Sequence, residues 1–102
     1  MGHTRCGAIK ATLDHIQNIE AVATESIHDI ISRIKPHIFA ITKIKDVSYE
    51  NKLELAVAAN VLASVGQLSH ASRMIESLVN KGDLRIVGAV LELDSGKVDF
   101  LE

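Results

Sequence analysis

The chain has 102 residues, a formal net charge of −2, and a composition that is 47% hydrophobic but only 3% aromatic. This length predicts one domain whose core is built from Ile, Leu, Val and Ala. The charge leaves no basic stripe for nucleic acid, and no apolar run approaches the ~20 residues of a membrane span.

The first eleven residues read M-G-H-T-R-C-G-A-I-K-A and contain His3 and Cys6, the latter being the only cysteine of the chain. Imidazole nitrogen and thiolate sulfur are ligands that Zn²⁺ prefers. The alanine-containing run after Cys6 predicts the first turns of a helix, and a helix N-terminus favours an anion such as a thiolate. An H-x-x-C pair alone more often reflects packing or coincidence than half of a metal site, so both interpretations remain open at this point.

Residues 14–35 are predicted to form a long helix, because apolar residues recur at three- and four-residue steps. Asp14 is its expected N-cap, and Pro36 is expected to end it by moving Lys35 away from helical angles. Residues 37–45 are short and apolar-rich and predict a further helical turn or two. The apolar stripe of the long helix consists of Ile16, Ile19, Ala23, Ile27, Ile30, Ile31 and Ile34.

Residues 48–68 predict a second long helix, with Ser48 as its N-cap. Ser69 is expected to cap a third helix over residues 69–81, which places a break near residues 66–70. Gly82 fits the left-handed stop after that helix. The apolar stripe of the second helix is Leu53, Val57, Val61, Val65 and Leu68.

The pattern then changes, and residues 84–93 are nearly continuously apolar, as in a strand that is covered on both faces. A turn signal over residues 94–96 and a short apolar return over 98–101 complete a predicted β-hairpin, 84–101. The chain is thus predicted to be mostly α-helical with a C-terminal β-hairpin. A two-stranded ribbon is marginal alone, and the mean hydropathy of +0.19 is high, so we expect a homo-oligomer, most simply a homodimer.

Two stretches resemble one known family. Residues 2–11 resemble the G-H-x-x-C-G-A-x-x-A stretch of the β-class carbonic anhydrases. Residues 82–98 are similar to the closing G-x-L-x-I-x-G-A-x-x-x-L-x-x-G-x-V hairpin of that family. Asn60, Val61 and Leu68 resemble positions of its penultimate helix. The three matches occur in the family's order and span nearly the whole chain.

The resemblance implies an α/β fold and a zinc-dependent carbonate dehydratase (a lyase), which hydrates carbon dioxide reversibly to bicarbonate. It implies that His3 and Cys6 are two of the three protein ligands to zinc and that the chain begins where the family's zinc-bearing strand is just ending. The family's C-x-D-S/A-R motif supplies the remaining cysteine ligand and an Asp–Arg pair that controls access to the metal, and the 102 residues do not contain it. The chain therefore resembles the C-terminal half of the family's domain and is expected to be inactive alone. The alternative is a non-catalytic truncated module that dimerises, or that associates with a full-length carbonic anhydrase or a fused transporter.

Several polar residues are assigned no chemistry. Thr4 and Arg5 lie between the two ligand positions, where the family's sequence varies, and receive no role. The single cysteine excludes an internal disulfide, and the N-terminus lacks a signal-peptide layout, so a cytoplasmic location is expected. The other four histidines are interpreted as solvated surface residues: His15, His28, His37 and His70.

Overall fold

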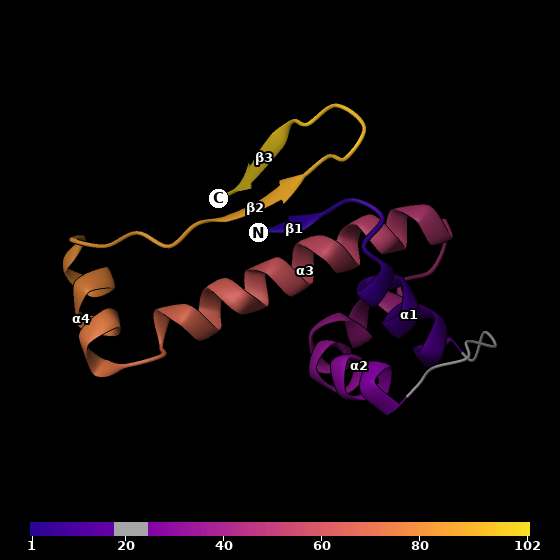
Figure 1. The fold of residues 1–102 in the computed structure, drawn as a ribbon, viewed down its shortest axis with the longest axis horizontal. Coiled ribbons are helices and arrows are strands. Elements are labelled where there is room, and N and C mark those ends of the chain that lie inside the picture. The colour runs from indigo at the N-terminus through magenta and orange to yellow at the C-terminus, as the bar shows by residue number, and fades with distance from the viewer. Residues whose placement is uncertain (18–24) are drawn as a thin grey trace.

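The structure is a computed structural model that describes residues 1–17 and 25–102. The long helix α3 runs through the middle of the fold, with a small sheet along one side, α1 and α2 near its N-terminal end and α4 at its other end (Figure 1). In chain order, the described elements are β1 (Gly2–His3), α1 (Gly7–Ile16), α2 (Glu25–Ile38), the 3₁₀ helix η1 (Phe39–Lys43), α3 (Tyr49–Ser69), α4 (Arg73–Lys81), β2 (Gly88–Leu91) and β3 (Val98–Leu101).

Among the described residues, β1, β2 and β3 form one sheet in that order. β1 pairs in parallel with β2, placing His3 opposite Leu91, and β2 pairs antiparallel with β3. The expected hairpin is therefore present. The expected strand over residues 84–93 is wrong in its extent, because β2 begins only at Gly88. Leu84 and Val87 precede β2, and these residues are 37% and 38% exposed. The apolar run 84–93 therefore includes exposed residues that do not belong to the strand.

Two glycines let the sheet approach α3 closely. A Cβ atom added at Gly88 would lie 2.8 Å from Cγ1 of Val61, and one added at Gly2 would lie 2.7 Å from Cγ2 of the same valine. Real Cβ atoms essentially never make such short contacts. The strands β1 and β2 can therefore pack on α3 at this depth only because both positions lack a side chain.

The N-terminal helices differ from the expected single helix over residues 14–35. α1 begins at Gly7 with Cys6 at its N-cap, so Asp14 is not an N-cap but lies buried within α1. The expected stripe is only partly buried, since Ile31 and Ile34 are buried, whereas Ile27 and Ile30 are exposed. Its positions Ile19 and Ala23 lie outside the described residues.

Pro36 does not end α2, which continues to Ile38 and passes into η1. Ile34 and Ile38 lie four residues apart on one helix face, and both side chains are buried in the core. Burial of Ile38 favours continuation of the helix, and Pro36, in the last turn, removes only a single N–H donor. The short helical turn expected over residues 37–45 is present as η1.

The two C-terminal helices begin and end largely as expected. The Ser48 hydroxyl accepts a hydrogen bond from the Asn51 N–H over 3.2 Å, which confirms the N-cap of α3. The break falls later than predicted, because α3 extends to Ser69 and Ser72, not Ser69, caps α4. Gly82 ends α4 in the left-handed conformation, with φ of 80°.

The core forms where α1, α2 and α3 meet. Leu13 and Ile38 are fully buried there, and the Thr12 hydroxyl, also buried, donates to the Ala8 carbonyl at 2.8 Å. The buried cluster comprises Ile9, Leu13, Ile34, Ile38, Ala56 and Val57. Among the helices of the described ranges, none combines the length and hydropathy needed to cross a bilayer.

A polar contact joins α1 to the start of α3. The Asp14 carboxylate accepts a hydrogen bond from the Tyr49 hydroxyl and pairs with Lys10 Nζ at 3.0 Å. The Lys10 ammonium also lies 5.7 Å from the centre of the Tyr49 ring. Because Asp14 is buried, these partners satisfy a carboxylate that would otherwise be costly to fold inside the protein. The contact fixes α1, and with it the Cys6 end of that helix, against α3.

This contact predicts a loss of stability at alkaline pH. Burial raises the pKa of the Tyr49 hydroxyl above its ordinary value of 10.0, and the adjacent Asp14 raises it further. The hydrogen bond to Asp14 likewise raises the pKa of Lys10 above its ordinary 10.5. Both groups hold protons more tightly in the folded state, so their stabilisation is complete below the unfolded pKa values and disappears as pH rises through the folded ones.

Tyr49 is the only tyrosine, and the chain has no tryptophan, so ultraviolet absorbance reports its ionisation directly. We expect the midpoint of the Tyr49 titration to lie at a higher pH in the folded chain than in the chain denatured by urea. The substitution Asp14→Asn should bring these two midpoints closer together. The free energy of unfolding should fall above about pH 10. Equal midpoints in folded and denatured chain would contradict this account.

Candidate functional site

His3 and Cys6 lie on either side of a turn from strand to helix. β1 ends at His3, and Cys6 is the N-cap residue of α1 with extended backbone angles (φ −62°, ψ 120°). Between them, Thr4 and Arg5 form a turn in which Arg5 adopts the left-handed conformation, with φ of 53°. Both candidate ligands are half-buried.

The His3 ring has one nitrogen occupied and one left for a ligand. Its Nδ1 lies 2.9 Å from the Thr4 carbonyl oxygen. Because a carbonyl oxygen only accepts hydrogen bonds, Nδ1 is the donor, and in the neutral imidazole the lone pair then lies on Nε2. Histidines that bind metals usually donate their other ring N–H to a carbonyl or a carboxylate in this way. Nε2 is therefore the ring nitrogen that could bind a metal ion.

Cys6 is anchored by its backbone, while its thiol caps no N–H of the helix. The Cys6 carbonyl accepts the Lys10 N–H at 2.9 Å, and the residue packs against the core cluster. Its sulfur is a free thiol at the N-terminal end of α1, where a negative charge is favoured. These features suit a thiolate ligand.

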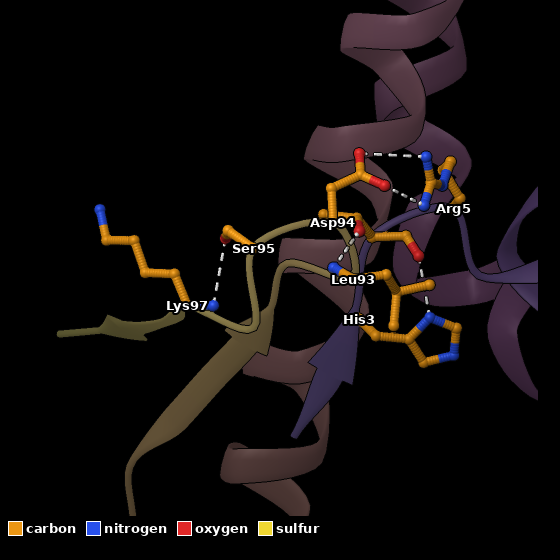
Figure 2. Close-up of polar contacts among 7 residues, drawn as sticks. His3, Arg5, Leu93, Asp94, Ser95 and Lys97 are labelled. Carbon is orange, nitrogen blue, oxygen red and sulfur yellow. Dashed lines mark hydrogen bonds and ion pairs between the residues drawn. The ribbon is translucent and has the colours of Figure 1, made fainter.

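Thr4 and Arg5, to which the sequence assigned no role, bind the hairpin turn. The Arg5 guanidinium donates to both carboxylate oxygens of Asp94, over 3.2 Å and 2.9 Å. The Thr4 hydroxyl accepts the Leu93 N–H at 3.1 Å, and the Thr4 N–H donates to the Leu91 carbonyl at 2.9 Å. Figure 2 shows Arg5 and Asp94 facing each other across the space between the end of β1 and the turn. The partners are up to 89 residues apart, so no local sequence signal could reveal them.

The other histidines do not join this site. The rings of His15 and His28 contact each other edge to face, with their centres 5.7 Å apart. Nε2 of His37 lies 3.4 Å from Nε2 of Gln67, and Nδ1 of His70 lies 3.6 Å from Oε1 of Glu76. Across residues 1–17 and 25–102, no three His, Cys, Asp or Glu side chains gather closely enough to hold a metal ion. The donor atoms of His3 and Cys6 are of the kinds that zinc prefers, but no third such side chain lies beside them within the described residues.

A surface hollow of about 580 Å³ lies elsewhere, between α2 and α3. Neither His3 nor Cys6 lines it, so it is not part of the candidate metal site. Its lining residues are Ile30, Ser32, Arg33, Ile34, Pro36, His37, Asn60, Ser64 and Gln67.

Comparisons with known proteins match nearly the whole chain. A family model described as carbonic anhydrase matches residues 1–98. A carbonic anhydrase of Mycolicibacterium smegmatis is 33% identical over 100 residues, a match that covers 98% of this chain and 46% of the relative. The solved structure of the β-carbonic anhydrase CcaA matches with a TM-score of 0.72 and 24% identity, over 99% of this chain and 48% of that chain. The likeness to CcaA confirms the expected α/β fold, and the chain spans about half the length of each relative.

Proposed function

Since this chain belongs to the β-class carbonic anhydrase family, we propose that it supplies two zinc ligands to an enzyme that reversibly hydrates carbon dioxide to bicarbonate. The observation that carries the proposal is the strand-to-helix turn that holds His3 and Cys6. There, the His3 Nδ1–H is bound to the Thr4 carbonyl, and the Cys6 thiol stands at the N-terminus of α1. The chemistry expected of such a site is activation of water near neutral pH, because a bound zinc ion lowers the pKa of water.

Each residue of the turn has a defined task in this proposal. His3 offers the Nε2 lone pair, and the Thr4 carbonyl holds the ring in the tautomer that leaves this lone pair free. Cys6 offers its sulfur as the second ligand, from the N-cap position of α1. A reducing compartment keeps that thiol available, so we place the protein in the cytoplasm.

The third ligand in this proposal is a cysteine from another polypeptide segment. A protein zinc site that keeps an open position for water uses three protein ligands, and Cys6 is the only cysteine in the 102 residues. A polypeptide of residues 1–102 alone is therefore expected to hydrate carbon dioxide no faster than buffer in a stopped-flow assay with added Zn²⁺. Zinc-dependent turnover well above the buffer rate would contradict the need for a further ligand.

Zinc binding tests the ligand assignment separately from activity. Cys6→Ser and His3→Ala are each expected to weaken zinc binding by more than about tenfold, since loss of even an outer-shell partner costs 10–100-fold. His70→Ala is the matched control, because His70 is the C-cap residue of α3 and pairs there with Glu76 at 3.6 Å. Zinc binding that survives both ligand substitutions would refute the assignment.

The alternative function is a non-catalytic module that dimerises, or that associates with a full-length carbonic anhydrase or a fused transporter. The supporting observation is the exposure of large apolar side chains on α3, where Leu55 and Leu62 are 45% and 51% exposed. We expect light scattering to show a dimer of the 11.1 kDa chain, most simply with two-fold symmetry. A monomer at all concentrations would oppose this alternative.

A further inference from the structure

We propose that Thr4, Arg5 and Asp94 are positioning residues for the two metal ligands. The turn between β2 and β3 (residues 92–97), which we call the brace, fixes the backbone conformation of Thr4 and Arg5. These are the two residues between His3 and Cys6. The inference rests on the proposed zinc role of His3 and Cys6, and it adds to that role the residues that orient the ligands.

The first observation is a continuous series of contacts that advances along both segments together. In the sheet, His3 lies opposite Leu91. The next residue, Thr4, binds the Leu91 carbonyl through its N–H and the Leu93 N–H through its hydroxyl. Arg5 then binds Asp94. The turn thus continues the pairing of β1 beyond the sheet, up to the residue that precedes Cys6.

The second observation is that the brace has a defined shape of its own. The Glu92 N–H donates to the Lys97 carbonyl and the Gly96 N–H donates to the Glu92 carbonyl, both over 2.8 Å. The Ser95 hydroxyl accepts the Lys97 N–H at 3.1 Å, as Figure 2 shows. Gly96 adopts a left-handed φ of 75°, which glycine allows without steric cost. Asp94 is therefore held in a closed turn.

The third observation is the backbone of Arg5. Arg5 adopts the left-handed conformation, which is unfavourable for a residue with a Cβ atom. The bidentate pair fixes the plane of the guanidinium against the carboxylate and so favours this one conformation of the turn. The side chains of Arg5 and Asp94 are 61% and 71% exposed. Such a pair contributes little to global stability, so its effect on the ligands can be measured apart from folding.

The test uses Co²⁺ as the probe with the full chain. Asp94→Ala and Thr4→Val are each expected to weaken Co²⁺ binding about two- to fivefold, the range expected for an exposed pair, and to change the thiolate-to-cobalt absorption band. Amide hydrogen exchange at Thr4 and Arg5 should accelerate in both variants without metal. Charge reversal in the double variant Arg5→Asp, Asp94→Arg should restore binding, since aspartate tolerates the left-handed conformation.

The matched control is Asp99→Ala, which breaks the exposed Lys97–Asp99 pair (3.2 Å) of the same hairpin without touching residues 2–6. It should leave Co²⁺ affinity, the absorption band and exchange unchanged. One outcome separates the two proposals. If Cys6→Ser abolishes the cobalt band, Cys6 is a ligand. If Asp94→Ala and Thr4→Val then keep the wild-type band and the wild-type Co²⁺ affinity, the brace is wrong. If the wild type forms no thiolate–cobalt band, the 102 residues do not bind the metal by themselves, and the test of the brace is then amide exchange without metal. Exchange at Thr4 and Arg5 that stays as slow in Asp94→Ala and Thr4→Val as in the wild type would contradict the brace.

Discussion

Replacing Leu13 with alanine should lower the free energy of unfolding by about 2–5 kcal/mol. Leu13 is fully buried where α1 meets α2 and α3, so the change removes apolar contacts and leaves a cavity. A domain of this size is stable by only about 5–15 kcal/mol, and the variant should therefore unfold at a clearly lower urea concentration. The measurement is urea denaturation followed by circular dichroism.

The control for this experiment is Leu68→Ala. Leu68 belongs to the stripe that the sequence predicted to be buried on α3, but its exposed fraction is 54%. Its replacement should change the free energy of unfolding by less than about 1 kcal/mol. Equal losses in the two variants would show that the core does not lie where α1, α2 and α3 meet.

Gly88→Ala should destabilise the fold by about 1–3 kcal/mol through overpacking. The added methyl group would meet Cγ1 of Val61 at 2.8 Å and Cγ2 of Val65 at 3.2 Å. Both valines lie in α3, where a β-branched side chain has one strongly preferred rotamer and cannot turn aside. The sheet must therefore move away from the helix, and the β1–β2 pairing beside His3 should weaken with it.

Two further variants make this prediction specific. Val61→Ala, combined with Gly88→Ala, should give a smaller loss than the sum of the single changes, with a coupling of about 0.5–3 kcal/mol. Gly66→Ala should instead stabilise the fold by about 0.5–1 kcal/mol, because Gly66 lies within α3 and an added Cβ would meet nothing within 4 Å. Destabilisation by Gly66→Ala as large as that by Gly88→Ala would contradict the packing argument.

Local chemistry made several elements predictable from the sequence. Ser48 caps α3 and Gly82 ends α4, because each acts on backbone groups within a few residues of itself. The family resemblance carried by residues 2–11 and 82–98 is confirmed by the family model that matches residues 1–98. These predictions needed no knowledge of distant contacts.

The errors arose where a distant partner decides the role of a residue. Asp14 resembled a helix cap, but Tyr49, 35 residues away, donates to its carboxylate inside the fold. Pro36 resembled a helix end, but the burial of Ile38 favours continuation of α2. Thr4 and Arg5 received no role because their partners lie in the turn near the other end of the chain. Periodicity and capping rules contain no information on such contacts.

The pairing of β1 with β2 also sets the order in which the protein can fold. Residues 2–3 pair with residues 90–91, so almost the whole described chain lies between the two strands. Closing so long a loop costs chain entropy and slows folding, because long-range contacts form only after that cost is met. The helical core around Leu13 consists of contacts closer in sequence and can form first. We therefore expect the turn that carries His3 and Cys6 to take its final shape late in folding, when the β2–β3 hairpin pairs with β1.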